Sequence, residues 1–230
     1  MLAASLQRIE ALPDDARVLD VGGWARPLAR ADAVIDLLPY ETRGLYGRDG
    51  DTERFGPEDW TQRDICDPEP WPYADDSFDV AVCSHTLEDV RDPIRVCREL
   101  SRVARSGYIE VPSIAEELCW GVQGRWVGWS HHRWLVERDG PGLSFAMKPH
   151  VIHGNPELHL PEAHRDELDD SARVEAVWWE GSIPASEQVF IGAGSFAEWA
   201  QERIEAFGGS AATNPAPKRR LRPVIRRTGR

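Results

Sequence analysis

The chain has 230 residues, 41% of them hydrophobic, and ten tryptophans, which is enough apolar material for the core of one globular domain. Its net charge is −12 at pH 7, and so acidic a protein repels phosphate backbones, which argues against nucleic acid as the main substrate of the folded domain. No apolar run is long enough to span a bilayer, and the first residues lack the pattern of a secretory signal, so we expect a cytoplasmic protein.

The number and spacing of the cysteines are typical of a protein from a reducing compartment. The chain has four, at positions 66, 83, 97 and 119, and they form no close CxxC pair. Cys83 and Cys97 lie in apolar surroundings that are typical of a core. We therefore expect reduced, structural thiols.

The first half of the chain alternates between helical and strand-like patterns. Residues 5–13 have apolar positions at helical spacing, and residues 16–21 form an apolar run that ends at glycines, which is typical of a buried strand entering a turn. Further strand-like runs lie at residues 32–39, 60–67, 78–85 and 107–113. Residues 92–105 have a helical period behind an Asp-Pro start. This order predicts an α/β fold with a Rossmann-like, doubly wound and mostly parallel sheet.

The region from about 114 to 170 breaks this alternation and is rich in tryptophan and histidine. Its one regular feature is a predicted hairpin over residues 133–149. We interpret this insert as a lid or an acceptor pocket, because aromatic faces stack on sugars and planar rings. Residues 172–194 predict two strands that form an antiparallel pair at the sheet edge, and residues 195–207 a closing amphipathic helix.

The C-terminal segment differs in charge from the rest of the chain. Residues 218–230 hold seven basic residues and no acid, so residues 1–217 carry a net charge of −19. We therefore expect one domain over residues 1–212 and a basic, disordered tail over residues 213–230. Two alternatives stay open for the tail, simple solvation or contact with an anionic partner such as a lipid headgroup or nucleic acid.

Polar residues follow the predicted strands where a ligand would bind. In an open α/β sheet, ligands bind beyond the carboxyl ends of the strands. Glycines there let the backbone approach a ligand, and a carboxylate after the second strand can accept both hydroxyls of a ribose. The residues at the predicted strand ends are Asp20, Gly22, Gly23, Asp36, Asp64, Ile65, Asp67, Ser84, His85 and Glu88.

These strand ends belong to a longer pattern that resembles a known family. Residues 15–113 are similar to the class I S-adenosylmethionine-dependent methyltransferases, in particular to the type 11 group. The most specific part of the likeness consists of Asp64, Trp71-Pro72, Asp76-Ser77-Phe78-Asp79, Leu87-Glu88, Asp92-Pro93 and Arg102-Val103.

The resemblance implies S-adenosyl-L-methionine as the cofactor. Asp20 and Gly22 would lie beside its methionine part, Asp36 on the ribose hydroxyls, and Asp64 with Ile65 at the adenine. The cofactor-binding set that it implies is Asp20, Gly22, Gly23, Asp36, Leu37, Asp64, Ile65 and Ser84.

Two positions depart from the family pattern. Trp24 takes the place of the second glycine in the first turn, and Asp89 stands where the family often has histidine. The first departure is compatible with S-adenosylmethionine, which has no pyrophosphate for the turn to wrap, so that Trp24 either points outward or covers the cofactor. The second bears on catalysis.

Three histidines are candidate catalytic residues. Methyl transfer is an in-line displacement that depends on alignment, and a hydroxyl acceptor also needs a base. His85, or one of His131 and His132, is the candidate base, while the alternative is that His85 caps a strand end and the histidine pair packs against tryptophans. His150 and His153 add further donors, but no helix places them on one face, so we predict no metal site.

The sequence thus predicts an S-adenosylmethionine-dependent methyltransferase that acts on a small-molecule or glycosidic acceptor, at oxygen. One alternative, motivated by Trp24 and Asp89, is a non-catalytic binding or interaction protein on the same fold. A nucleotide-dependent oxidoreductase is disfavoured because the chain has no G-x-G-x-x-G segment to hold a pyrophosphate.

Overall fold

The computed structural model describes residues 1–208. The basic tail predicted over residues 213–230, and the last four residues of the predicted domain, lie outside the described residues. Within the described part, no helix has both the length and the apolar composition that a membrane crossing needs.

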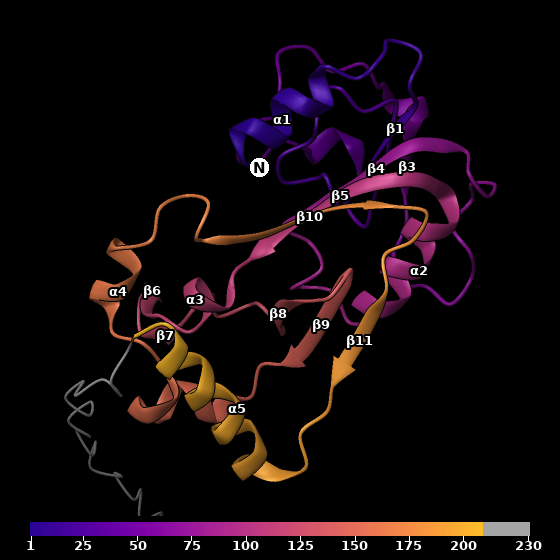
Figure 1. The fold of residues 1–230 in the computed structure, drawn as a ribbon. Coiled ribbons are helices and arrows are strands. Elements are labelled where there is room, and N and C mark those ends of the chain that lie inside the picture. The colour runs from indigo at the N-terminus through magenta and orange to yellow at the C-terminus, as the bar shows by residue number, and fades with distance from the viewer. Residues whose placement is uncertain (209–230) are drawn as a thin grey trace, which may run out of the picture.

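The main sheet has six strands in the order β10-β5-β4-β1-β2-β3. It lies in the upper part of the view in Figure 1. Strands β1 to β5 are parallel to their neighbours, and β10 runs antiparallel to β5 at one edge. The strands are β1 (Val18–Val21), β2 (Ala33–Asp36), β3 (Trp60–Gln62), β4 (Phe78–Ser84), β5 (Ala104–Pro112) and β10 (Val174–Glu180). The prediction of a Rossmann-like, mostly parallel sheet with an antiparallel edge strand is confirmed.

Two helices accompany this sheet where the sequence predicts them. Helix α1 (Ala3–Glu10) precedes β1, and α2 (Pro93–Val103) joins β4 to β5. Helix α2 starts where its sequence favours a helix N-terminus, because the Asp92 side chain accepts a hydrogen bond from the Arg95 backbone N–H and Pro93 occupies the first turn. Its buried face includes Val96, Cys97, Leu100 and Val103.

The crossovers from β1 to β2 and from β2 to β3 contain no α-helix. The first runs through residues 22–32 as turns, and the second contains only 3₁₀ turns at Tyr40–Thr42 and Pro57–Asp59. The predicted alternation of strands and helices therefore fails at this end of the sheet. Glycines and a proline in the short first crossover disfavour a helix, and its chain is instead fixed by hydrogen bonds to the strands.

Strand β4 shows how the sheet separates two cores. Val80 and Val82 pack into the core on the side of α1, whereas Ala81 and Cys83 pack into the core on the side of α2. This alternation follows from the two-residue period of a strand and explains why the whole run is apolar. All four cysteines are free and buried, as predicted for reduced structural thiols.

The insert and the C-terminal part form a second layer beside the sheet (Figure 1). The predicted hairpin is present as β8 (Trp134–Asp139) and β9 (Gly142–Met147), which pair antiparallel. The other elements are α3 (Ile114–Glu117), β6 (Trp120–Gln123), β7 (Trp126–Val127), α4 (Glu162–Asp166), β11 (Ala185–Gln188) and α5 (Gly192–Ala206), together with 3₁₀ turns at His150–Gly154 and Pro156–Leu158.

The prediction for the two last strands is half wrong. Strand β10 pairs with the sheet edge, but β11 pairs in parallel with β9 in a separate three-stranded sheet. The chain turns away after β10 at Gly181, whose φ of +72° suits glycine. The Leu143 N–H then donates to the Pro184 carbonyl, which begins the pairing with the hairpin.

Candidate functional site

One large cavity opens at the carboxyl ends of β1, β2 and β4. Its volume is about 1150 Å³. It is lined by all of the predicted cofactor-binding and candidate catalytic residues, namely Asp20, Gly22, Gly23, Asp36, Leu37, Asp64, Ile65, Ser84, His85, His131 and His132. Of the other predicted strand-end residues, Glu88 lines it and Asp67 does not. The structure therefore brings the predicted cofactor residues and the three candidate bases to one place.

The turn after β1 is held by a buried carboxylate. Asp20 is 4% exposed, and its Oδ2 accepts a hydrogen bond of 2.8 Å from the Leu28 backbone N–H. Burial raises its pKa to about 7, helped by the charges of Asp36 and Asp49 and opposed by the Leu28 hydrogen bond. This end of the cavity is thus acidic and favours a cationic ligand.

Both glycines of this turn are required by their surroundings. A Cβ on Gly22 would lie 2.3 Å from Thr86 Oγ1, and the φ of Gly22 is +78°. A Cβ on Gly23 would lie 2.0 Å from Asp20 Oδ2. The backbone here passes too close to its neighbours for any other residue.

Asp36 ends β2 and fixes the two loops beside it. Its Oδ2 accepts from the Trp24 backbone N–H at 3.0 Å, and its Oδ1 accepts from the Leu38 N–H at 2.8 Å. Burial raises its pKa, and the amide hydrogen bonds partly offset this. Each oxygen has a second lone pair, so the carboxylate can still accept hydroxyl groups.

Trp24 does not seal the cavity. Its indole Nε1–H donates to Thr42 Oγ1 at 2.9 Å, which directs the ring toward the crossover between β2 and β3. The residue lines the cavity and packs against the core on the side of α1. The tryptophan in the second glycine position is therefore part of the cavity wall.

The Asp64 carboxylate is already paired with another side chain. Its Oδ2 pairs with Arg91, and its Oδ1 accepts from the Cys66 backbone N–H at 2.8 Å. Burial acts to raise its pKa, but Arg91 and the amide lower it below the usual value. Ile65 beside it is buried, whereas Leu37 is 61% exposed at the rim of the cavity.

His85 follows β4 between two buried glutamates. Its Nε2 lies 3.2 Å from Glu110 Oε1, and its Nδ1 lies 3.4 Å from Glu88 Oε1. Burial acts to lower its pKa, but the two carboxylates raise it to about 9. Its φ of +52° is uncommon for a residue other than glycine and adds backbone strain at this strand end.

The insert contributes a buried charged network. His132 Nδ1 lies 2.7 Å from Glu117 Oε1, and Lys148 Nζ lies 2.7 Å from Glu117 Oε2. Burial acts to raise the pKa of Glu117, but the contacts with His132 and Lys148 lower it. The ionised carboxylate only accepts, so Nδ1 of His132 carries a hydrogen, and in the neutral form of the ring Nε2 has the lone pair.

The two remaining candidate metal donors lie elsewhere. The Nδ1 of His153 accepts a hydrogen bond from the Val127 N–H, and its ring packs against Trp126. His150 is exposed. Neither of them lines the cavity.

Several residues of the site were not singled out by the sequence. Glu117 and Lys148 are 31 positions apart, and Glu110 lies inside an apolar strand pattern, so only the fold reveals these contacts. Residues of the cavity wall that the sequence did not single out include Thr86, Arg91, Arg133 and Arg173. A buried acid in a strand otherwise apolar, such as Glu110, was the one available signal.

Residues 48–109 match a family model described as a methyltransferase domain. No curated protein matches the chain.

Solved structures resemble about half of the chain. They include the YcgJ protein from Bacillus subtilis, at 20% identity over 49% of this chain and 52% of that chain, with a TM-score of 0.36. A second is a methyltransferase from Thermotoga maritima described as a possible histamine N-methyltransferase, at 21% identity, 49% and 51% coverage and a TM-score of 0.33. A third is a putative methyltransferase from Listeria monocytogenes, at 14% identity, 59% and 71% coverage and a TM-score of 0.35.

The chain spans about half the length of the first two of these proteins. The assignment therefore rests on the sheet order, the cavity at the strand ends and the family model. Together they confirm the resemblance to a methyltransferase domain, which the family model matches over residues 48–109, and the Rossmann-like fold.

Proposed function

We propose that the protein transfers a methyl group from S-adenosylmethionine to an oxygen of a small-molecule or glycosidic acceptor. The observation that carries the proposal is the single cavity. The sheet ends line one part of it with Asp20, Gly22 and Asp36, and the insert lines another with Trp129 and His132. At about 1150 Å³ it is larger than most sites for one small ligand, which supports binding of a cofactor together with an acceptor.

The residues present fit this cofactor. A sulfonium cation suits an end of the cavity that holds the buried carboxylates of Asp20 and Asp36. Gly22 and Gly23 leave the backbone bare beside them. When bound, S-adenosylmethionine supplies a methyl group on a positively charged sulfur.

His85 and His132 differ in whether they can take a proton from an acceptor. His85, with a pKa of about 9, is protonated at neutral pH, and its two ring N–H groups face Glu110 and Glu88, so it has no lone pair with which to act as a base. In its neutral form His132 has the lone pair on Nε2, because Nδ1 donates its hydrogen to Glu117. We therefore assign His132 as the base for an acceptor hydroxyl, with Glu117 as its positioning residue.

Calorimetric titration tests the cofactor assignment. We expect saturable binding of S-adenosylmethionine and S-adenosylhomocysteine and none of NADH. The Asp36→Ala variant should lose the binding, while Asp15→Ala, which removes an exposed acid outside the cavity, should keep it. Absence of binding to both sulfur ligands in a folded protein contradicts the proposal.

A second candidate is a binding protein without turnover. It is favoured by Asp89, which stands where the family pattern often has histidine, and by Asp64, whose carboxylate already pairs with Arg91. The two functions differ in turnover. Formation of S-adenosylhomocysteine with any hydroxylated small molecule or glycoside supports the enzyme, and tight binding with no product from a broad set supports the alternative.

A further inference from the structure

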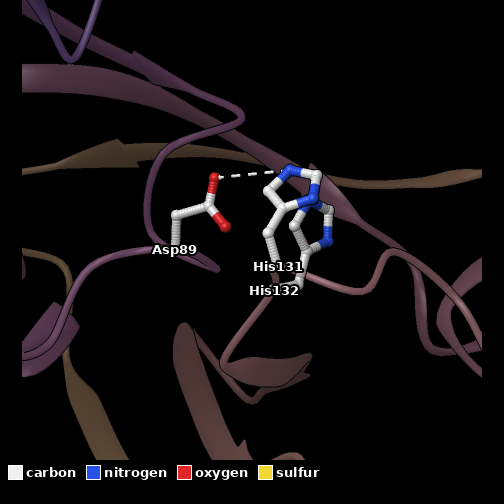
Figure 2. A group of neighbouring side chains, drawn as sticks. All are labelled: Asp89, His131 and His132. Carbon is white, nitrogen blue, oxygen red and sulfur yellow. Dashed lines mark ion pairs between the residues drawn. The ribbon is translucent and has the colours of Figure 1, made fainter.

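Three side chains from distant parts of the chain meet on the insert side of the cavity. Asp89 follows β4, and His131 and His132 precede β8. One ligand atom of each lies within 4.8 Å of the others. Figure 2 shows the Asp89 carboxylate directed toward the His131 ring, with His132 beside it. We propose that these residues bind a divalent transition metal ion of the Zn²⁺ type.

The donor set points to this class of ion. Two imidazoles and one carboxylate suit zinc and ferrous iron, while magnesium and calcium prefer sites built from oxygen. Three protein ligands leave further coordination positions open, as in catalytic rather than structural metal sites. The open positions face the cavity that all three residues line.

The contacts behind His132 support the assignment. Metal-binding histidines commonly donate their second ring N–H to a carboxylate, which fixes the ring and its tautomer. Here Glu117 accepts from His132 Nδ1 at 2.7 Å and is itself held by Lys148 at 2.7 Å. The side chains of Glu117 and Lys148 are 1% and 2% exposed, so His132 is held rigidly with Nε2 free.

Unpaired carboxylate oxygens lie at the same place. Asp89 Oδ1 is buried and has no hydrogen-bond partner among residues 1–208. Both carboxylate oxygens of the neighbouring Glu88, whose side chain is 1% exposed, also lack a hydrogen bond, although one lies 3.4 Å from His85. Buried carboxylates without full pairing are costly, and a bound cation offsets that cost.

The geometry needs only a small adjustment. Ligands at about 2.1 Å from one tetrahedral ion lie about 3.4 Å apart. His131 Nε2 lies 3.9 Å from Asp89 Oδ2, and the two histidine rings are 4.6 Å apart between centroids. The His131 side chain is 56% exposed and is free to rotate toward the other two.

This site also narrows the acceptor, an extension that rests on the proposed function. With three protein ligands, an ion that expands from four to five ligands has two open positions. It would then bind a hydroxyl next to a second oxygen, as in a diol or a hydroxy acid, and would lower the pKa of that hydroxyl. Its proton leaves to water, the oxygen–carbon bond to the methyl group forms, and the carbon–sulfur bond breaks with its electron pair on sulfur. When the ion is bound, His132 is one of its ligands, and the ion replaces His132 as the group that activates the acceptor hydroxyl.

Cobalt binding tests the site directly. We would strip the untagged full chain with a chelator and titrate it with Co²⁺, following visible absorption and the bound metal by mass spectrometry. One equivalent of Co²⁺ should bind and give the intense visible absorption of a site with four or five ligands. The variants His131→Ala and Asp89→Asn should each lower the affinity for Co²⁺ by more than about tenfold. His150→Ala, at an exposed histidine outside the cavity, is the matched control and should bind normally.

The outcomes separate this inference from the proposed function. Absence of Co²⁺ binding, or equal binding in both variants and the parent, overturns the metal site. The measurement contains no S-adenosylmethionine, and binding of S-adenosylhomocysteine is measured separately by calorimetry. Failure of the second measurement alone overturns the proposed function and leaves the metal site standing.

Discussion

The two walls of the cavity are built by different means. The sheet wall consists of Asp20, Gly22, Gly23 and Asp36, whose carboxylates accept backbone N–H groups from adjoining loops. The insert wall consists of Trp129, His131 and His132, and is held from behind by the buried pair of Glu117 and Lys148. Backbone position therefore determines the first wall, and paired charge determines the second.

The largest effect should come from breaking the buried pair behind the insert wall. Glu117→Leu leaves the Lys148 ammonium buried and unpaired, and we expect a loss of about 3–5 kcal/mol in the free energy of unfolding. Chemical denaturation measures it, with the exposed Glu187→Ala as the control. The double variant Glu117→Leu/Lys148→Met should recover most of the loss, and a double variant no more stable than the single one contradicts this account.

Crowding the sheet wall should have the next largest effect. Gly22→Ala adds a Cβ within 2.4 Å of the Thr86 side chain at a φ of +78°, and we expect a loss of about 2–4 kcal/mol. Gly47→Ala is the matched control, because its φ is +87° with no atom within 4 Å of the added Cβ. The difference between the two losses of stability measures the effect of the steric contact with Thr86. Equal losses would show that the backbone strain of a positive φ accounts for the whole effect.

The charge of the sheet wall should appear in the pH dependence of cofactor binding. Asp20 has a pKa of about 7, so it ionises as the pH rises from 6 to 8. A bound sulfonium favours the ionised form, and each unit by which it lowers this pKa strengthens binding about tenfold above pH 7. The neutral sulfur of S-adenosylhomocysteine should show a smaller change, and parallel pH profiles for the two ligands in calorimetry contradict this role for Asp20.

The smallest effect concerns the junction of the two walls at His85. Its pKa is raised from 6.5 to about 9 by Glu110 and Glu88 against the effect of burial. The stabilisation is therefore complete below about pH 6.5 and disappears as the pH rises through 9. Thermal denaturation between pH 7 and 9 should show a decline that His85→Gln flattens and His150→Gln leaves unchanged. An unchanged slope in His85→Gln rules out this contribution.

The sheet wall could be predicted from the sequence to a large extent. Its strands are continuous apolar runs such as Val80–Cys83, which a buried parallel strand requires on both faces. Because ligands bind where such strands end, the position of Asp20 and Asp36 followed from local pattern alone.

The rest of the fold depends on contacts that local pattern does not contain. The sequence predicts the last strand in the main sheet, but the short and largely polar β11 carries no pattern that specifies a partner, and the hairpin supplies one. The missing crossover helices follow from hydrogen bonds to Asp20 and Asp36 that replace helical ones. The pairing of Glu117 with Lys148 depends on how the insert folds back, so no spacing rule could have found it.

The crossovers without helices have a consequence for how ligands enter. A packed helix opens only with a large part of its fold, whereas an exposed loop opens locally at a lower free energy. Residues 37–59 contain no α-helix, and their exposed Leu37, Leu45 and Tyr46 line the cavity. Entry and release can therefore proceed by local unfolding of this loop while the sheet and the insert stay folded, so the amide hydrogens of this segment should exchange with solvent fastest when the cavity is empty.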